Sequence, residues 1–361
     1  MVAIRKLLLR SHFPVTIAAK RAQRAGPRRP RVIICGVEIL LTGASGFVGS
    51  LLLPRLLRDG HAVRALARDP QRLLGPAAAA RAGGAPGATL SVHGGDVVSG
   101  LGLQDAFEGV EVAYYLIHSM EPGGESFVER ERRAAENFAA AAHAAGVRRI
   151  VYLGGLVPRW IVDAGGDRAA AMRRSRHLDS REQVERILLG ALPDSLSLRA
   201  SIVIGARSRS FRLLVRLVER LPVLALPAWQ RFRTQPIDER DVTELLLAAA
   251  TTALSGLRLE VGGPDVLSYG QMLEQIAEAM LVGRPAVRLR VNMTKIAGRI
   301  AAAIASEEPE LVLPLMEGLQ GDLLPDEQDA AARLGVRVHS FCSAVEHALA
   351  EWERAEPLAA R

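Results

Sequence analysis

Cysteine is nearly absent from this chain of 361 residues, which contains only Cys35 and Cys342. The two lie far apart and match no metal-ligand spacing, so a disulfide framework and a cysteine metal site are excluded, and a reducing, cytoplasmic compartment is expected. Aromatic residues make up 4% of the chain. No apolar run reaches the roughly 18 residues that a membrane-spanning helix needs, so no such helix is expected.

The basic excess of the chain, +7 at neutral pH, comes from its first 36 residues, which contain nine Lys or Arg and no acidic residue. The remainder holds 37 basic and 39 acidic residues and is therefore not a nucleic-acid binder. Residues 1–36 are predicted to be a disordered basic extension or a wrongly assigned start. A transit peptide, or a segment that contacts anionic lipid or RNA, is the alternative. The Ala- and Arg-rich composition favours a bacterial source.

What the sequence does contain is a strand, a glycine-rich turn and a helix in direct succession. The apolar run Ile39-Leu40-Leu41 predicts a short buried strand. Apolar residues at helical spacing from Val48 to Leu56, closed by Asp59-Gly60, predict the helix. This order is the context in which a glycine-rich turn binds a dinucleotide, and a turn without a ligand is the alternative.

Each glycine of this turn has a predicted task. Gly43 allows a sharp turn, Gly46 allows the backbone to approach a pyrophosphate, and Gly49 allows the helix to pack close to the strand. The N–H groups at the start of the helix then hold the phosphates, assisted by the helix dipole. The predicted cofactor-binding residues of this stretch are Thr42, Gly43, Ser45, Gly46, Phe47, Val48 and Gly49.

Strands that alternate with helices, without tight hairpins, predict an α/β fold: a Rossmann-type doubly wound parallel sheet with a smaller C-terminal α/β substrate lobe. The expected domains are residues 37–205 for the dinucleotide-binding part and 206–361 for the lobe interleaved with it. Residues 75–88 are predicted to be a surface loop, and a loop-rich region is expected to run through residues 221–229. The expected strands are 39–41, 61–68, 89–93, 111–118, 149–153, 195–200, 258–261 and 287–291, and the main helices are 125–145, 177–189, 241–250 and 268–280.

The end of the second expected strand carries Arg68. Where NAD is preferred, an acidic residue near this place bonds the ribose 2′-hydroxyl, whereas arginine suits the 2′-phosphate of NADP. Arg64 lies earlier on the same strand. Arg68 therefore favours NADP as the cofactor, with NAD as the alternative, unless it is only a solvated surface charge.

The fourth expected strand ends at Leu116-Ile117-His118. Ligands of open α/β sheets lie at the carboxyl ends of the strands, so these three residues are predicted to contact the cofactor, and His118 and the following Ser119 are predicted to lie near its nicotinamide ribose. His118 is also a candidate acid, although a histidine at a strand end is often only a structural hydrogen-bonding group.

Several segments in chain order resemble the atypical NAD(P)-binding short-chain dehydrogenases/reductases, a group with NmrA-like proteins and relatives of an accessory subunit of respiratory complex I. The resemblance covers about residues 37–350. It implies that Asp96 contacts adenine with Val97 beside it, although Asp96 is alternatively a turn residue, and that Gly154 lies at the cofactor. The matching segments are 42–49, 95–97, 113–120, 149–156, 199–205, 233–237 and 260–267.

The catalytic set of the enzymes in this family, a Ser followed by Tyr-x-x-x-Lys, is missing. Gly154 or Gly155 stands at the serine position, and His177 and Arg181 stand at the tyrosine and lysine positions. His177 is a candidate proton donor, and Arg181, which does not deprotonate, is a candidate anchor for a ribose or substrate oxygen. The alternative is that catalysis is lost and that both residues merely line the cofactor site or pair with Asp179 or Glu185.

Two functions are compatible with these residues. The first is an oxidoreductase that transfers hydride between NADP(H) and a carbonyl or conjugated substrate. The second is a non-catalytic NADPH-binding redox sensor or assembly subunit, which the missing catalytic set favours. A nucleotide-sugar epimerase is a weaker third option because it normally needs the absent tyrosine and lysine. The expected partners are a small-molecule substrate and either a second copy of the chain, in a homodimer, or a peripheral protein partner.

Overall fold

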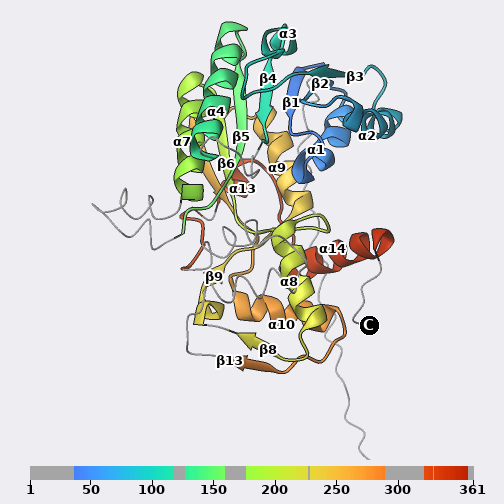
Figure 1. Ribbon diagram of the computed structural model, residues 1–361, viewed down its shortest axis with the longest axis vertical. Helices are drawn as coiled ribbons and strands as arrows, with labels where there is room; N and C mark the ends of the chain where they lie inside the picture. The colour runs from blue at the N-terminus through green and yellow to red at the C-terminus, as the bar shows by residue number, and fades with distance from the viewer. Residues whose placement is uncertain are drawn as a thin grey trace, which may run out of the picture. The chain divides into compact units, whose positions relative to one another are not determined.

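The computed structural model describes residues 36–117, 127–158, 176–226, 228–288, 321–327 and 329–356 (Figure 1). Residues 34–361 form one compact unit, and the description below concerns this unit.

A seven-stranded sheet in the order β11-β6-β5-β4-β1-β2-β3 forms the centre of this unit, and all neighbouring strands are parallel. The order reverses between β1 and β4, which is where open α/β sheets bind ligands at the carboxyl ends of their strands. The predicted Rossmann-type sheet is therefore confirmed. The strands are β1 (Glu38–Thr42), β2 (Ala62–Ala67), β3 (Thr89–Gly94), β4 (Val112–Tyr115), β5 (Arg149–Gly155), β6 (Leu196–Ala200) and β11 (Leu257–Val261).

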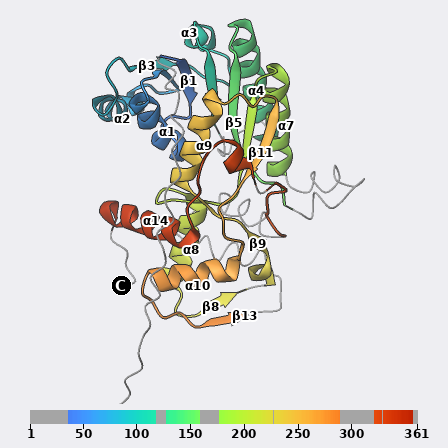
Figure 2. The same cartoon turned by 180° about the vertical axis from the view of Figure 1, so that it is seen from behind.

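Helices cover both faces of this sheet, as Figures 1 and 2 show from opposite sides. One face packs against α3 (Leu103–Phe107), α4 (Phe127–Ala144) and α7 (Arg176–Ala191), with Tyr115 and Tyr152 buried in that layer. The other face packs against four helices, α1 (Phe47–Arg58), α2 (Gln71–Ala82), α9 (Glu239–Thr251) and α13 (Ala330–Arg333). A sheet covered on both faces explains why its strands read as apolar runs in the sequence.

A second hydrophobic core lies around Trp229, Tyr269 and Trp352, within segments that follow residue 200. Because α9 and β11 belong to the large sheet layer, the chain after residue 205 contributes to both cores. The domain boundary between residues 205 and 206 stays a prediction. The elements of this part are β7 (Val203–Ile204), α8 (Arg209–Arg220), β8 (Leu224–Leu226), the short 3-10 helix η2 (Ala228–Arg231), β9 (Arg233–Thr234), β10 (Ile237–Asp238), β12 (Leu267–Ser268), α10 (Tyr269–Ala279), β13 (Ala286–Arg288) and α14 (Phe341–Ala355).

The surface loop predicted for residues 75–88 is partly wrong, because α2 extends through Ala82. Gly75 and Pro76 suggested a break, and both lie inside the helix. Leu73 and Ala77 are buried against the sheet, and the alanines that follow favour helix, so packing and propensity outweigh the two unfavourable residues.

Helix α8, which precedes the expected loop-rich region, was not predicted from the sequence. Its signals were nevertheless present. The Ser208 side chain accepts a hydrogen bond from the Phe211 N–H at 3.4 Å, and Phe211, Leu214, Val215 and Val218 recur at helical spacing on the buried side.

The fourth strand is shorter than predicted and ends at Tyr115, not at residue 118. The Leu116 N–H donates to the Thr42 hydroxyl at 3.2 Å, so the chain leaves the strand ladder at this residue. Leu116 and Ile117 consequently lie in the loop that follows the strand, and residues 118–126 lie outside the described part of the chain.

Candidate cofactor and active site

The turn between β1 and α1 has the close contacts predicted for its glycines. Gly43 has a φ of +70°, and a Cβ placed on it would lie 2.5 Å from the Leu116 carbonyl oxygen. A Cβ on Gly49 would lie 2.2 Å from the Gly43 carbonyl oxygen, so α1 can approach the turn only without a side chain there. The Gly46 N–H donates to the Gly43 carbonyl at 2.9 Å and closes the turn. Any larger residue at Gly43 or Gly49 would therefore deform this loop.

The start of α1 presents its backbone without a side-chain cap. Gly46 is the N-cap residue, and no side chain accepts a hydrogen bond from the first turn, which contains no acidic residue. Ser45 and Gly46 are exposed, whereas Phe47 and Val48 are half-buried, and Val48 packs against the core. Uncapped N–H groups at an accessible helix start bind phosphate oxygens, so this turn fits the pyrophosphate of a dinucleotide.

Thr42, predicted to contact the cofactor, has a structural task. It is fully buried, its hydroxyl donates to the Tyr114 carbonyl at 2.8 Å, and the same oxygen accepts from the Leu116 N–H. This pair of hydrogen bonds fixes the end of β1 to the end of β4. Thr42 thus sets the separation between the glycine turn and the Leu116 loop, and a direct cofactor contact stays a prediction.

The two arginines of β2 and its end have different surroundings. The Arg64 guanidinium donates to the carbonyls of Asp105, Ala106 and Glu108 at 2.8–3.1 Å, which ties it to the end of α3. Arg64 therefore has a structural role and is not a candidate for the cofactor phosphate. Arg68 directly follows β2 at the carboxyl edge of the sheet and is exposed.

Asp96 follows β3, the neighbouring strand, and belongs to a turn. Its Oδ1 accepts from the Val98 N–H at 2.9 Å, and its carbonyl accepts from the Gly100 N–H at 2.8 Å. These bonds support the structural alternative for Asp96, and its contact with adenine stays a prediction. Val97 is buried in the layer below α4, where its carbonyl accepts from the Asn137 side chain at 2.9 Å.

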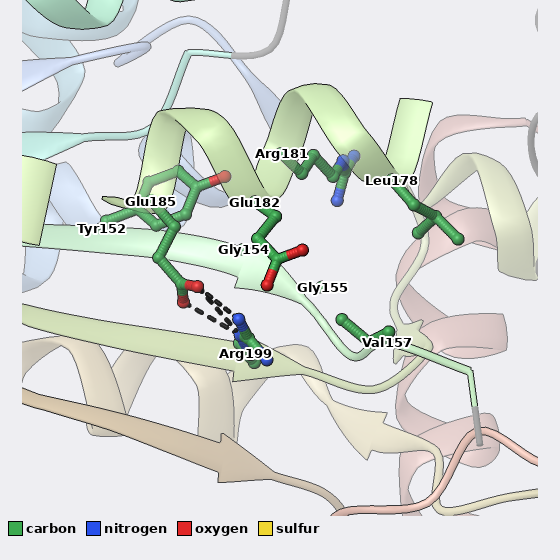
Figure 3. Close-up of a pocket in the computed structure, with 9 residues that line it drawn as sticks. All are labelled: Tyr152, Gly154, Gly155, Val157, Leu178, Arg181, Glu182, Glu185 and Arg199. Atoms are coloured by element: carbon green, nitrogen blue, oxygen red, sulfur yellow. Dashed lines mark hydrogen bonds and ion pairs between the residues drawn. The ribbon is translucent and has the colours of Figure 1, made fainter. Parts of the chain in front are cut away.

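The end of β5 borders a small pocket that also involves α7 and β6 (Figure 3). Arg181 projects from α7 toward the strand end, and a Cβ placed on Gly155 would lie 3.1 Å from its Nη1. A Cβ on Gly154 would lie 3.0 Å from the ring of Tyr152. The two glycines at the expected serine position thus leave room for these two side chains.

Of the three predicted catalytic residues, the structure places Arg181 at the pocket. His177 lies in the first turn of α7, four residues before Arg181, but its side chain lies outside the described part of the structure. His118, predicted both as an acid and as a cofactor contact, lies outside the described residues altogether.

From the sequence, Glu185 was expected only as an alternative partner for His177 or Arg181, and the other polar residues of the pocket were not predicted. Glu185 is buried and accepts from the Arg199 Nε at 2.9 and 3.2 Å, from the Ser197 hydroxyl, and from Arg258 at 3.1 Å. Arg199 also lies 3.5 Å from Glu260. The spacing of Arg181 and Glu185, one helical turn apart, was the available signal that both face the same pocket.

A buried carboxylate, Glu239, lies behind the glycine turn. A Cβ on Gly205 would lie 1.8 Å from its Oε2 and 2.8 Å from the Phe47 ring, so Gly205 leaves space for both groups. The His347 Nε2 of α14 lies 3.5 Å from the other carboxylate oxygen. Phe47, the first residue of α1, therefore lies near the ionisable pair of Glu239 and His347.

Burial raises the pKa of Glu239 to about 7, and the nearby Asp238 and Glu351 raise it further, against the lowering effect of Arg240 and Arg207. The folded protein therefore keeps a proton that the unfolded chain loses above its ordinary pKa of 4.5. A raised carboxyl pKa makes the folded state relatively less stable as the pH rises through this window.

We expect the free energy of unfolding to contain a component that falls by on the order of 3 kcal/mol between about pH 4.5 and 7, and that the Glu239→Gln variant lacks. Urea denaturation at a series of pH values measures it. Glu278→Gln, which changes an exposed carboxylate of α10, is the control and should keep the wild-type profile. An unchanged profile in Glu239→Gln would contradict the assignment.

Among the described residues, no helix is long and apolar enough to cross a membrane. The same part of the chain contains no group of three His, Cys, Asp or Glu side chains arranged to hold a metal ion.

Comparison with known proteins matches residues 43–187 to a family described as NAD(P)H-binding. A 3-beta-hydroxysteroid dehydrogenase of Mycolicibacterium neoaurum is 32% identical over 124 residues, which cover 32% of this chain and 31% of the relative. A dihydroflavonol 4-reductase of Zea mays is 33% identical over 121 residues, which cover 32% of this chain and 33% of the relative. The similarity thus spans about a third of these curated relatives.

Solved structures share the fold over most of the chain. A UDP-glucuronic acid 4-epimerase variant from Bacillus cereus, in complex with a UDP-sugar analogue and NAD, has a TM-score of 0.64 at 14% identity, covering 89% of this chain and 100% of that chain. The Bordetella bronchiseptica enzyme WbmH in complex with NAD+ has a TM-score of 0.61 at 15% identity, covering 89% and 99%. At these identities the likeness concerns the fold.

Proposed function

We propose that the protein is an NAD(P)H-dependent oxidoreductase of the short-chain dehydrogenase/reductase type, and the match of residues 43–187 to a family described as NAD(P)H-binding supports this proposal. The observation that carries this proposal is the β1–α1 turn, in which Gly43 and Gly49 leave no room for side chains and the start of α1 is uncapped. The substrate is a carbonyl or conjugated compound, bound beside the ends of β4 and β5.

In this proposal, one set of residues binds the cofactor and a second set positions the substrate and supplies the proton. The backbone of Ser45, Gly46 and Phe47 holds the pyrophosphate, and Arg68 faces the adenosine ribose. When bound, the nicotinamide supplies or accepts a hydride. Arg181 supplies a fixed positive charge at the end of β5, where oxygen of the ribose or substrate is held, and His177 is the proposed proton donor.

NADP is the proposed cofactor. Arg68 is exposed at the end of β2. The neighbouring acid, Asp69, accepts a hydrogen bond from the Gln71 N–H at 3.1 Å at the start of α2. An arginine at this edge suits a 2′-phosphate, and the engaged aspartate is a poor partner for a 2′-hydroxyl.

We expect Arg68→Ala to weaken NADPH binding by about 10- to 100-fold, because it removes a charge-assisted hydrogen bond to the 2′-phosphate, and to leave NADH binding within about twofold. Titration of each cofactor, followed by its fluorescence, measures both constants. Arg58→Ala is the matched control, since Arg58 is exposed at the C-terminal end of α1, at the opposite end of that helix from the glycine turn. Equal losses for both cofactors would argue against a role at the 2′-phosphate.

The second candidate function is a non-catalytic NADPH-binding protein, a redox sensor or an assembly subunit. Gly154 and Gly155 at the serine position and Arg181 at the lysine position favour it. Consumption of NADPH, followed by its fluorescence with a panel of ketones, aldehydes and enones, discriminates the two. Tight cofactor binding without any turnover would favour the second.

The finer assignments are also proposals. The segments shared with the atypical, NmrA-like reductases support placement of the chain in that group. The low cysteine content supports a cytoplasmic location. A homodimer or a peripheral protein partner is also proposed.

A further inference from the structure

Arg181 differs from the other charged residues of the β5 pocket because its guanidinium has no partner among the described residues. No hydrogen bond or ion pair joins Arg181 to any residue that the structure describes, and its Nε is buried without a partner. Arg181 is half-buried, and its Nε is a buried donor of the kind that native proteins nearly always pair. The pocket therefore contains a positive charge with which no described residue pairs, and a buried donor that is available to a ligand.

The charges around Arg181 are already balanced. Glu185 is satisfied by Arg199 at 2.9 Å and by Arg258 at 3.1 Å, so two guanidinium groups neutralise this carboxylate. Glu182 lines the pocket too and has its own interaction, but it forms no ion pair with Arg181. An anion that enters the pocket thus meets Arg181 without displacing an existing partner.

Tyr152 lines the same pocket and contributes no negative charge. Burial raises the pKa of its hydroxyl above the ordinary value, against the lowering effect of Arg181, so it is a neutral phenol at physiological pH. A phenol beside a guanidinium is a favourable environment for a carboxylate or an enolate oxygen.

Gly155 determines whether this arrangement exists. A Cβ there would lie 3.1 Å from the Arg181 Nη1, which is closer than an ordinary van der Waals contact. A serine at residue 155 would need this space. The position of Arg181 therefore depends on glycine at residue 155. Because Gly155 has no side chain, the Arg181 guanidinium can reach the end of β5.

We propose that Arg181, reaching over Gly155, binds an oxyanion of the substrate, so that the substrate carries a carboxylate or an acidic enol oxygen. This inference rests on the proposed function and names its substrate class. A guanidinium fork binds the two oxygens of a carboxylate in parallel, which also gives the substrate a fixed orientation.

Calorimetric titration of the NADP+-saturated protein with acetate and benzoate, and with acetamide and benzamide as neutral counterparts, tests the inference. Saturation with cofactor keeps the phosphate-binding turn from taking the probe. At least one carboxylate should bind about tenfold or more tightly than its amide. Arg181→Gln should remove this difference, and Gly155→Ser should reduce it. Arg186→Gln, which changes an exposed arginine of the same helix, should preserve it.

Normal NADP+ binding with no preference for either carboxylate, or with a preference that Arg181→Gln retains, would overturn the inference and leave the proposed function intact. Loss of benzoate preference together with unchanged NADP+ affinity in Arg181→Gln would assign Arg181 to the substrate. A loss of NADP+ affinity alone in this variant would assign it to the ribose and overturn the inference. Failure of the wild-type protein to bind either cofactor would instead refute the proposed function.

Discussion

Replacement of Gly49 by alanine is expected to weaken NADPH binding by about 100-fold or more and to lower the free energy of unfolding by about 1–3 kcal/mol. The added methyl would lie 2.2 Å from the Gly43 carbonyl oxygen and 2.9 Å from the Ala44 Cα, both of which are backbone. The turn cannot relieve this contact without moving the N–H groups that hold the pyrophosphate. Cofactor titration and urea denaturation measure the two effects.

Gly190→Ala is the matched control for this substitution. Gly190 lies in α7 without a positive φ, and a methyl group added there would have no atom within 4 Å. Alanine should therefore stabilise the protein by about 0.5–1 kcal/mol through helix propensity and leave cofactor binding unchanged. Wild-type NADPH affinity in Gly49→Ala would show that the turn does not bind the phosphates.

Glu185→Ala is expected to lower the free energy of unfolding by about 3–5 kcal/mol, the largest change that we predict for a single polar residue. The substitution leaves Arg199, which is 8% exposed, and the Ser197 hydroxyl buried without their main acceptor.

An exposed ion pair serves as the control for the buried pair of Glu185 and Arg199. Glu136→Ala breaks an exposed pair with Arg132 on α4, in which the nitrogen and oxygen lie 2.6 Å apart, and should cost less than about 1 kcal/mol. The double variant Glu185→Met with Arg199→Met should be more stable than Glu185→Ala, because it removes the buried Arg199 charge together with its main acceptor. Equal costs for Glu185→Ala and Glu136→Ala would contradict the buried network.

The strands and helices of the sheet could be predicted because each is determined by residues that are close together in the sequence. The apolar run of β1 and the Ser268 cap of α10, which the structure confirms as a capping box, are each set within a few residues. The parallel arrangement of the strands followed from their alternation with helices. The end of β4 could not be predicted, because it depends on a hydrogen bond between Leu116 and Thr42, 74 positions apart.

Within the site, the glycine turn was predictable for the same reason, whereas the pocket at β5 was not. Gly154, Gly155 and Arg181 could be placed by spacing, but the packing of Arg181 over Gly155 depends on how α7 docks on the sheet. The hydrogen bonds from Arg64 to the carbonyls at the end of α3 likewise join segments that are distant in the sequence, so they could not be predicted from it. The residues of the site could thus be identified from the sequence, but their hydrogen-bond and packing partners could not.

Binding of NAD(P)H at the β1–α1 turn is the property on which the proposed function depends. Calorimetric titration of the wild-type protein with NADPH tests it most directly. We predict one cofactor per chain, with a dissociation constant of about 1 µM or below and weaker binding of NADH. Absence of heat and of fluorescence change with both cofactors, in protein shown to be folded, would contradict cofactor binding at this turn.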